Sequence, residues 1–146
     1  MRWVTWQNVG VDRMACAWLI RRFIDPKAEF LFVPQGQTPL PKGAEPFDIP
    51  KARLSHHRGH CSFHAIVKAY RLGSNAALER IARIVDEADT VQEAQVEPIS
   101  VGLDALCRGI RKTSRNDKSA LREGARIYDA LYAELGGGAP SKRRPK

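Results

Sequence analysis

The spacing of apolar residues predicts that short strands and one helix alternate in the first third of the chain. Apolar alternation over residues 3–11 indicates a short strand followed by a turn. Asp12 is a candidate N-cap for a helix over residues 12–24, and Asp25-Pro26 would end that helix. A continuous apolar run over residues 29–33 indicates a buried strand.

The next segment changes from loop to short extended pieces. Residues 35–46 are rich in Pro and Gly and are predicted to be mostly loop. Residues 47–49 and 53–55 are each long enough for a short strand. The second of these leads directly into the segment that begins at His56.

From residue 62 onward the apolar residues recur at helical spacing and predict four more helices. Their candidate caps or first residues are Ser62, Ser74 or Asn75, Pro98 and Asp117. Leu106 falls on the apolar stripe of the third of these helices, and Asp86 falls on the polar side of the second. The whole pattern predicts an α+β fold with a small N-terminal sheet of three or four short strands covered by about five helices.

Composition places the chain among ordinary globular proteins. A length of 146 residues suits one domain, with 43% hydrophobic and 27% charged residues. No apolar run approaches the roughly 20 residues that span a bilayer, and the first residues do not read as a secretory signal. The three widely spaced cysteines fit a reducing compartment. We therefore expect a cytoplasmic protein without membrane contact.

The formal charge of +8 is concentrated partly at the C-terminus. Residues 136–146 begin with three glycines and carry Lys142, Arg143, Arg144 and Lys146 without an acidic residue. We predict one domain over residues 1–135 followed by a disordered basic tail. A nucleic-acid-binding arm is possible but not favoured, because no aromatic residue interleaves these charges.

All four histidines and one cysteine fall within the nine residues 56–64. Imidazole and thiolate are preferred ligands of first-row metals, so we predict a site for a divalent Zn, Ni, Co or Fe ion. The same groups would also suit a redox or proton-transfer site. The alternative is a solvated basic loop with incidental histidines, since the segment lacks the Cys-x-x-Cys spacing of standard zinc sites. The candidate ligands, with one carboxylate to complete the shell, are His56, His57, His60, Cys61, His64 and Asp89.

The cysteines are expected to differ in environment. Cys61 precedes a helix among cationic or metal-binding neighbours, where its thiol pKa would fall and its reactivity would rise. Cys16 and Cys107 each lie among apolar residues and are expected to be small core residues.

The segment from residue 12 to residue 25 suggests an anion site. The N-terminus of the predicted helix, capped by Asp12, would present free N–H groups, and Arg13 would add a bidentate donor. Arg21 and Arg22 are further candidates, and salt bridges on a solvated face are the alternative for all three arginines. We expect this site to face the histidine segment at the end of the sheet.

Several ordered blocks resemble the chromate-resistance (ChrB) family. They are the segments 11–13, 18–25, 29–34, 46–50, 54–56, 61–63 and 128–132. The similarity is to the C-terminal domain of longer members, which carry an N-terminal region associated with transcriptional regulation of chromate-resistance operons. It implies that the family-like polar positions are Asp12, Arg13, Arg21, Arg22, Asp48, His56, Cys61 and Asp89.

Three functional hypotheses follow. The leading one is a chromate-resistance or chromate-sensing domain that binds a metal ion, a tetrahedral oxyanion such as chromate or sulfate, or both. The second is a metal-dependent hydrolase or redox enzyme that leaves one metal position open for substrate. The third is a nucleic-acid-binding regulator, for which the sequence offers no recognition element. Whether the protein has an enzymatic turnover is open, and a homo-oligomer is possible.

Overall fold

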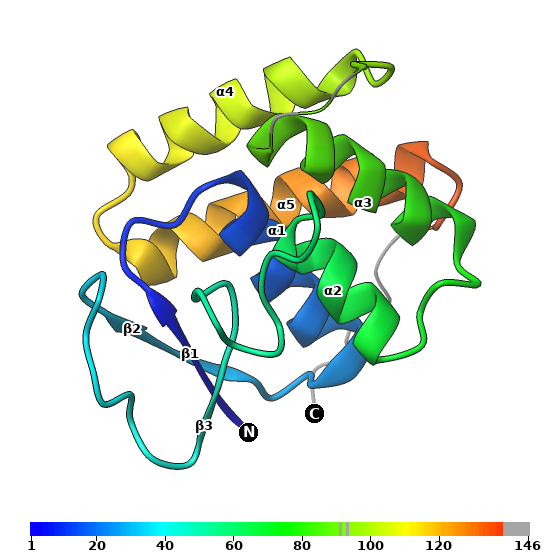
Figure 1. Cartoon of the computed structure of the whole chain (residues 1–146). Coiled ribbons are helices and arrows are strands. Elements are labelled where there is room, and N and C mark those ends of the chain that lie inside the picture. Colours follow the sequence, from blue (N-terminus) through cyan, green and yellow to red (C-terminus); the bar gives the residue numbers. More distant parts are fainter. Residues whose placement is uncertain (91, 93, 139–146) are drawn as a thin grey trace, which may run out of the picture.

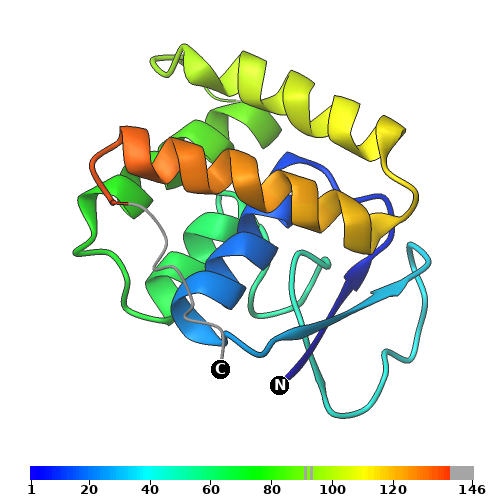
Figure 2. The ribbon, with the colours of Figure 1, turned by 180° about the vertical axis from the view of Figure 1, so that it is seen from behind.

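The computed structural model describes residues 1–90, 92 and 94–138. Its sheet has three parallel strands in the order β2-β1-β3. The strands are β1 (Arg2–Trp6), β2 (Glu29–Val33) and β3 (Ala44–Pro46). The sheet lies at one side of the molecule, with the helices gathered on the other (Figures 1 and 2). This arrangement confirms the predicted α+β fold with a small N-terminal sheet.

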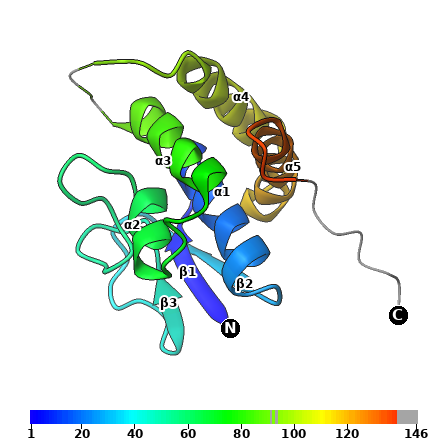
Figure 3. The ribbon, with the colours of Figure 1, turned by 90° about the vertical axis from the view of Figure 1, so that its right-hand side faces the viewer.

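The helices occupy most of the remaining described chain. They are α1 (Val11–Leu19), α2 (Ser62–Ala69), α3 (Ala76–Asp89), α4 (Ile99–Thr113) and α5 (Asp117–Glu134). The predicted first helix continues beyond α1 as a turn of π-helix, η1 (Ile20–Ile24). α4 lies farthest from the sheet (Figures 1 and 3).

α1 is the central element of the core. All of its residues except Arg13 are buried, because its sequence is apolar or small around nearly the whole helix. It packs against α2, α3, α4 and α5. Trp18 on α1 contacts the rings of Phe23, Phe63, Tyr128 and Tyr132. This packing fixes the position of the two polar residues near the start of α1.

Two strand predictions are wrong. β3 lies inside the stretch predicted as loop, and residues 47–49 and 53–55 form only an isolated bridge between Phe47 and Leu54. Asp48 and Lys51 adopt positive φ angles of 51° and 71°, so the chain turns and cannot continue as a strand.

Helix starts also differ from the prediction. α1 begins one residue earlier than expected, with Gly10 as its N-cap, so Asp12 does not cap this helix. α5 is capped by Asn116, whose side chain accepts from the Ser119 N–H, rather than by Asp117. The predicted cap at Asn75 is confirmed, since its side chain accepts from the Leu78 N–H.

The faces of two helices are also corrected. Leu106 is 55% exposed and lies on the outer face of α4, since α4 is covered on one side only. Asp86 is 5% exposed instead of facing solvent, because α2 packs against this side of α3. This buried carboxylate contacts His60 and His64, as described below.

Residues 136–138 remain in contact with the rest of the fold. The Gly137 N–H donates to the Tyr132 carbonyl at 2.8 Å, and Arg22 Nη2 donates to the Gly138 carbonyl at 3.3 Å. The rest of the predicted basic tail, residues 139–146, lies outside the described residues. Within the described part, none of the helices is long and apolar enough to cross a bilayer.

Candidate metal centre

The N-terminus of α2 is capped by carboxylates from two other helices. Asp12 on α1 accepts from the Ser62 N–H through Oδ2 at 2.8 Å and from the Phe63 N–H through Oδ1 at 2.9 Å. Asp86 on α3 accepts from the Cys61 N–H through Oδ1 at 2.8 Å. Free N–H groups and the positive end of a helix stabilise negative charge. The start of α2 therefore holds two carboxylates in fixed orientations.

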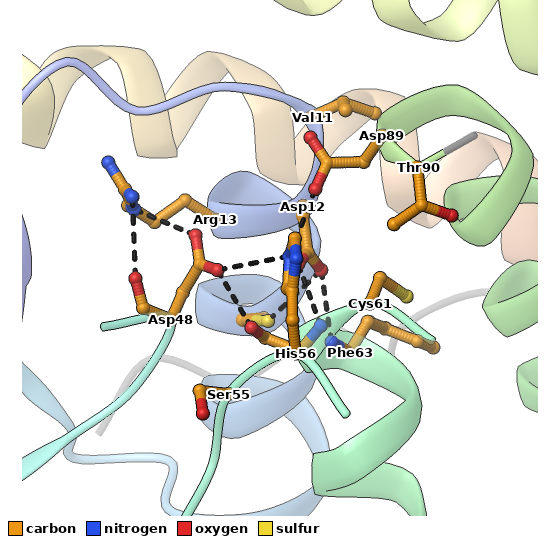
Figure 4. A network of polar contacts seen from close by, with 12 residues as sticks. Val11, Asp12, Arg13, Asp48, Ser55, His56, Cys61, Phe63, Asp89 and Thr90 are labelled. Atoms are coloured by element: carbon orange, nitrogen blue, oxygen red, sulfur yellow. Dashed lines mark hydrogen bonds and ion pairs between the residues drawn. The ribbon is translucent and has the colours of Figure 1, made fainter. Parts of the chain in front are cut away.

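One histidine meets the first of these carboxylates. His56 Nε2 lies 2.9 Å from Asp12 Oδ2, 3.1 Å from Asp89 Oδ2 and 3.5 Å from Asp48 Oδ1. The carboxylates point toward the imidazole from α1, the end of α3 and the loop after β3 (Figure 4). We call Asp12, Asp48, His56 and Asp89 the Asp-His centre. The expectation that the start of the first helix faces the histidine segment is confirmed.

Asp48 is held by two neighbours and has a perturbed pKa. Arg13 Nε donates to its Oδ2 at 2.8 Å, and the Ser62 hydroxyl donates to its Oδ1 at 2.7 Å. Burial raises the pKa of Asp48 to about 6, and the nearby Asp12 carboxylate acts in the same direction. With this pKa, the Asp48 carboxyl group is mostly ionised at neutral pH and adds negative charge to the centre.

The imidazole of His56 compensates part of this negative charge. Its pKa is raised to about 10, first by its hydrogen bond with Asp12 and next by that with Asp89. His56 is therefore an imidazolium at neutral pH in the absence of a metal. Since its side chain is 46% exposed, the group stays accessible from solvent.

The charge of the centre favours a cation over an anion. Three carboxylates and the Arg13 guanidinium leave two negative charges when His56 is neutral. A divalent ion compensates this charge, whereas a chromate or sulfate dianion would add to it. The potential ligand atoms of Asp12, His56 and Asp89 lie within 4.8 Å of one another.

Arg13 does not offer the open fork that an oxyanion site needs. Besides the bond from Nε to Asp48, its Nη1 donates to the Trp6 and Gln7 carbonyls and its Nη2 to the Asp48 carbonyl. Asp12 is directed toward α2 and does not cap α1, so the expected Asp12 cap beside Arg13 is absent at the start of α1.

Arg21 and Arg22 lie at the far end of the same helical segment and do not join Arg13. Arg21 Nη2 donates to the Ala28 carbonyl at 2.8 Å, and Arg22 Nη1 forms an ion pair with Asp129 at 2.9 Å. The structure thus divides the four predicted oxyanion residues between two regions.

The other histidines lie apart from the Asp-His centre. His60 and His64 converge on Asp86, and their potential ligand atoms form a second group within 4.8 Å of one another. His57 is exposed, and its Nε2 lies 3.0 Å from the Arg53 carbonyl. The nine-residue segment therefore does not build one metal shell but divides its histidines between different partners.

Cys61 is inaccessible, and the expected fall of its thiol pKa is not found. It is 0% exposed, and burial raises its thiol pKa well above the usual range, with the Asp12 and Asp86 charges next in importance. Its sulfur contacts the Ala82 carbonyl at 3.8 Å and belongs to neither group of converging ligand atoms. Cys16 and Cys107 are buried in the core as predicted.

Two residues near these sites were not predicted from the sequence. The sequence pattern places Asp86 on a solvated face, because its helical stripe is otherwise polar. Arg111 on α4 lines a surface depression of about 390 Å³ together with Asp12, His56 and Asp89. No local pattern distinguishes Arg111 from the other arginines of the chain, since only the packing of α4 brings it there.

Comparisons with known proteins support one family. The family described as ChrB, C-terminal domain, matches residues 3–135. Protein ChrB of Cupriavidus metallidurans is 34% identical over 142 residues, which cover 97% of this chain. The chain spans 42% of the length of that relative. No solved structure matches the chain.

Proposed function

Since this chain belongs to the ChrB C-terminal domain family, we propose that it is a chromate-resistance domain that binds a divalent transition metal at the Asp-His centre. The ligands are Asp12, His56 and Asp89. The convergence of their ligand atoms around an excess of negative charge is the observation that carries the proposal.

The available lone pairs support this assignment. Asp12 Oδ1 accepts from the Phe63 N–H and contacts the Cys16 sulfur at 3.5 Å, whereas its Oδ2 accepts from only one backbone N–H. Oδ2 therefore keeps a lone pair directed toward His56. Asp89 lies in the last turn of α3, where the helix dipole disfavours a carboxylate. A cation at the centre offsets that cost.

Two carboxylates and one imidazole form a hard to borderline donor set. Such a set suits Co²⁺, Fe²⁺ or Zn²⁺ and leaves coordination positions open. The open side faces the depression that Arg111 lines. Chromate could occupy such a position as a metal ligand, with Arg111 as its cationic neighbour. The same position would serve a metal-dependent hydrolase or redox enzyme.

Metal titration tests the centre directly. Protein without an affinity tag is freed of metal with a chelator and titrated with Co²⁺ by calorimetry, alongside His56→Ala, Asp89→Asn and His57→Ala. The first two variants should weaken binding at the centre by at least about tenfold, because each removes a ligand. His57→Ala removes an exposed histidine that is not a ligand and should bind as the parent does.

Stability separates a ligand from a structural residue. Asp89→Asn should keep its melting temperature within a few degrees while losing metal affinity, since a neutral side chain suits the helix C-terminus. Equal Co²⁺ affinity in the parent, His56→Ala and Asp89→Asn would refute the proposal.

A second titration addresses chromate. Chromate should bind the Co²⁺-loaded protein more tightly than the metal-free protein, and Arg111→Ala should weaken that binding by about tenfold through loss of one charge-assisted hydrogen bond. Arg108→Ala is the matched control, because Arg108 is paired with Asp104 on the same helix. Equal losses in both variants would mean that only overall charge attracts chromate.

A further inference from the structure

We propose that the chain has a second divalent-metal site, formed by His60, His64 and Asp86. One potential ligand atom from each residue lies within 4.8 Å of the others. The site shares no residue with the Asp-His centre, so it can be present whether or not that centre binds metal. We call it the His-His site.

Both imidazoles present the same nitrogen to one carboxylate oxygen. His60 Nδ1 lies 2.8 Å and His64 Nδ1 lies 3.4 Å from Asp86 Oδ2. The two rings lie 4.1 Å apart between centroids with an angle of 31° between their planes. Two nitrogen atoms and one oxygen atom thus lie close enough together to share one metal ion.

Asp86 is fixed in the orientation that the site requires. Its Oδ1 accepts from the Cys61 N–H at 2.8 Å, which leaves Oδ2 directed toward the two histidines. The residue is 5% exposed. A buried carboxylate needs a compensating positive charge, and the start of α2 supplies only part of one.

The hydrogen bonding of His64 is incomplete within the described part of the chain. Its Nδ1 is buried and makes no hydrogen bond there, although Asp86 Oδ2 lies 3.4 Å away. A buried polar atom without a partner is costly and calls for an explanation. His60 Nδ1 already makes the short contact with Asp86 Oδ2. Protonation of His60 therefore leaves His64 Nδ1 without a hydrogen-bond partner. A metal ion would accept the lone pairs of both nitrogens and of Asp86 Oδ2 together.

The backbone before α2 holds His60 in place. His57 and His60 exchange two backbone hydrogen bonds, at 3.1 Å and 2.9 Å, across a two-residue turn. The φ angles of Arg58 and Gly59 are 50° and 80°, as a tight type I′ turn requires. The Gly59 carbonyl also accepts from Thr90 Oγ1 at 3.3 Å. The turn is thereby tied to the end of α3, and metal binding would need little rearrangement.

The site is accessible and its donor set indicates the metal. The side chains of His60 and His64 are 52% and 28% exposed and border a surface depression of about 540 Å³. Arg58 and Lys68 border it too, but their long stems allow the charged ends to stay in solvent. Two imidazoles and one carboxylate suit Zn²⁺, Ni²⁺ or Cu²⁺, with water completing the shell.

Zinc titration with matched variants tests the His-His site. Tag-free, chelator-treated protein is dialysed against Zn²⁺ and its metal content is measured, together with His64→Ala, His56→Ala and His57→Ala. His64→Ala should lose one bound equivalent or weaken it by at least about tenfold. That equivalent should be retained in His56→Ala and in His57→Ala. Unchanged zinc content and affinity in His64→Ala would overturn the proposal.

An NMR measurement on the parent protein gives an answer that is independent of how any variant folds. Addition of one equivalent of Zn²⁺ should shift the imidazole nitrogen resonances of His60 and His64 and leave those of His57 in place. Shifts at His57 alone would show adventitious surface binding and would refute the His-His site. Loss of zinc in His56→Ala with no effect in His64→Ala would assign zinc to the Asp-His centre instead.

Discussion

Asp12 determines what the Asp-His centre can do, because each of its carboxylate oxygens accepts a hydrogen bond from a backbone N–H group. Two N–H groups of α2 bind its two oxygens, so the carboxylate cannot rotate away from His56 without uncapping that helix. The same contacts turn the group away from the start of its own helix. A residue that resembles an N-cap in the sequence is in fact the cap of a helix 50 residues later.

The raised pKa of His56 predicts how stability depends on pH in chelator-treated protein. The folded-state pKa of about 10 lies above the ordinary value of 6.5, so the charged imidazole stabilises the folded state. This contribution is fully present below pH 6.5 and is lost as the pH rises through 10. The difference in melting temperature between the parent and His56→Gln should therefore shrink from pH 6.5 to pH 10.

Because the imidazole is nearly half exposed, solvent screens this effect and the shift should be modest. His57→Gln gives the background expected for an exposed histidine. A difference between the parent and His56→Gln that stays constant from pH 6.5 to pH 10 would contradict the assigned protonation.

Sequence reasoning at this scale identified His56, Asp12 and Asp89 but not how they would be used. The histidine-rich segment was visible because the residue types are unusual. The burial of Cys61 was not visible, because a cysteine before a helix reads the same whether α3 covers it or not. Arg111 was missed for the corresponding reason, since its place at the centre depends on the packing of α4.

α1 and α5 approach each other closely at Gly124 on α5, which faces Met14 on α1. A Cβ atom at Gly124 on α5 would lie 2.9 Å from Met14 Sδ and 3.3 Å from Met14 Cβ. The sulfur can move, but the Cβ atom of Met14 is fixed by α1. The two helices can therefore approach this closely only without a side chain at position 124.

Gly124→Ala should therefore destabilise the protein. Overpacking is expected to cost about 1–3 kcal/mol, which exceeds the gain of about 1 kcal/mol in helix propensity. Gly109→Ala on α4 is the control, because no described atom lies within 4 Å of a Cβ there. It should stabilise by about 0.5–1 kcal/mol. Urea unfolding measures both changes, and a stabilised Gly124→Ala would show that the helices can separate without cost.

The helices were largely predictable as elements because their apolar stripes recur over several turns. The segment after β2 was not. Its turns use positive φ at Asp48 and Lys51, which are not glycines, so the chain reversal leaves no clear mark in the sequence. β3 is only three residues long and contains Pro46, which an edge strand tolerates but which reads as loop.

For the whole molecule, both candidate sites depend on contacts between distant segments. His56 and Asp12 are 44 positions apart, and His60 and Asp86 are 26 apart. An apolar pattern predicts that a helix has a buried face but not which helix covers it. The sequence therefore supports the α+β class, whereas the strand order and the pairing of each histidine with its carboxylate require the packed structure.

The capping of α2 by its neighbours has a consequence for the order in which the chain folds. α2 has only eight residues, too few to be stable alone, and the carboxylates that cap it belong to α1 and α3. It should form only after both neighbours have docked. Ala65→Gly costs about 1 kcal/mol in a helix and probes this step. Stopped-flow measurements should show faster unfolding of this variant with a nearly unchanged folding rate, whereas slower folding would mean that α2 already forms in the transition state.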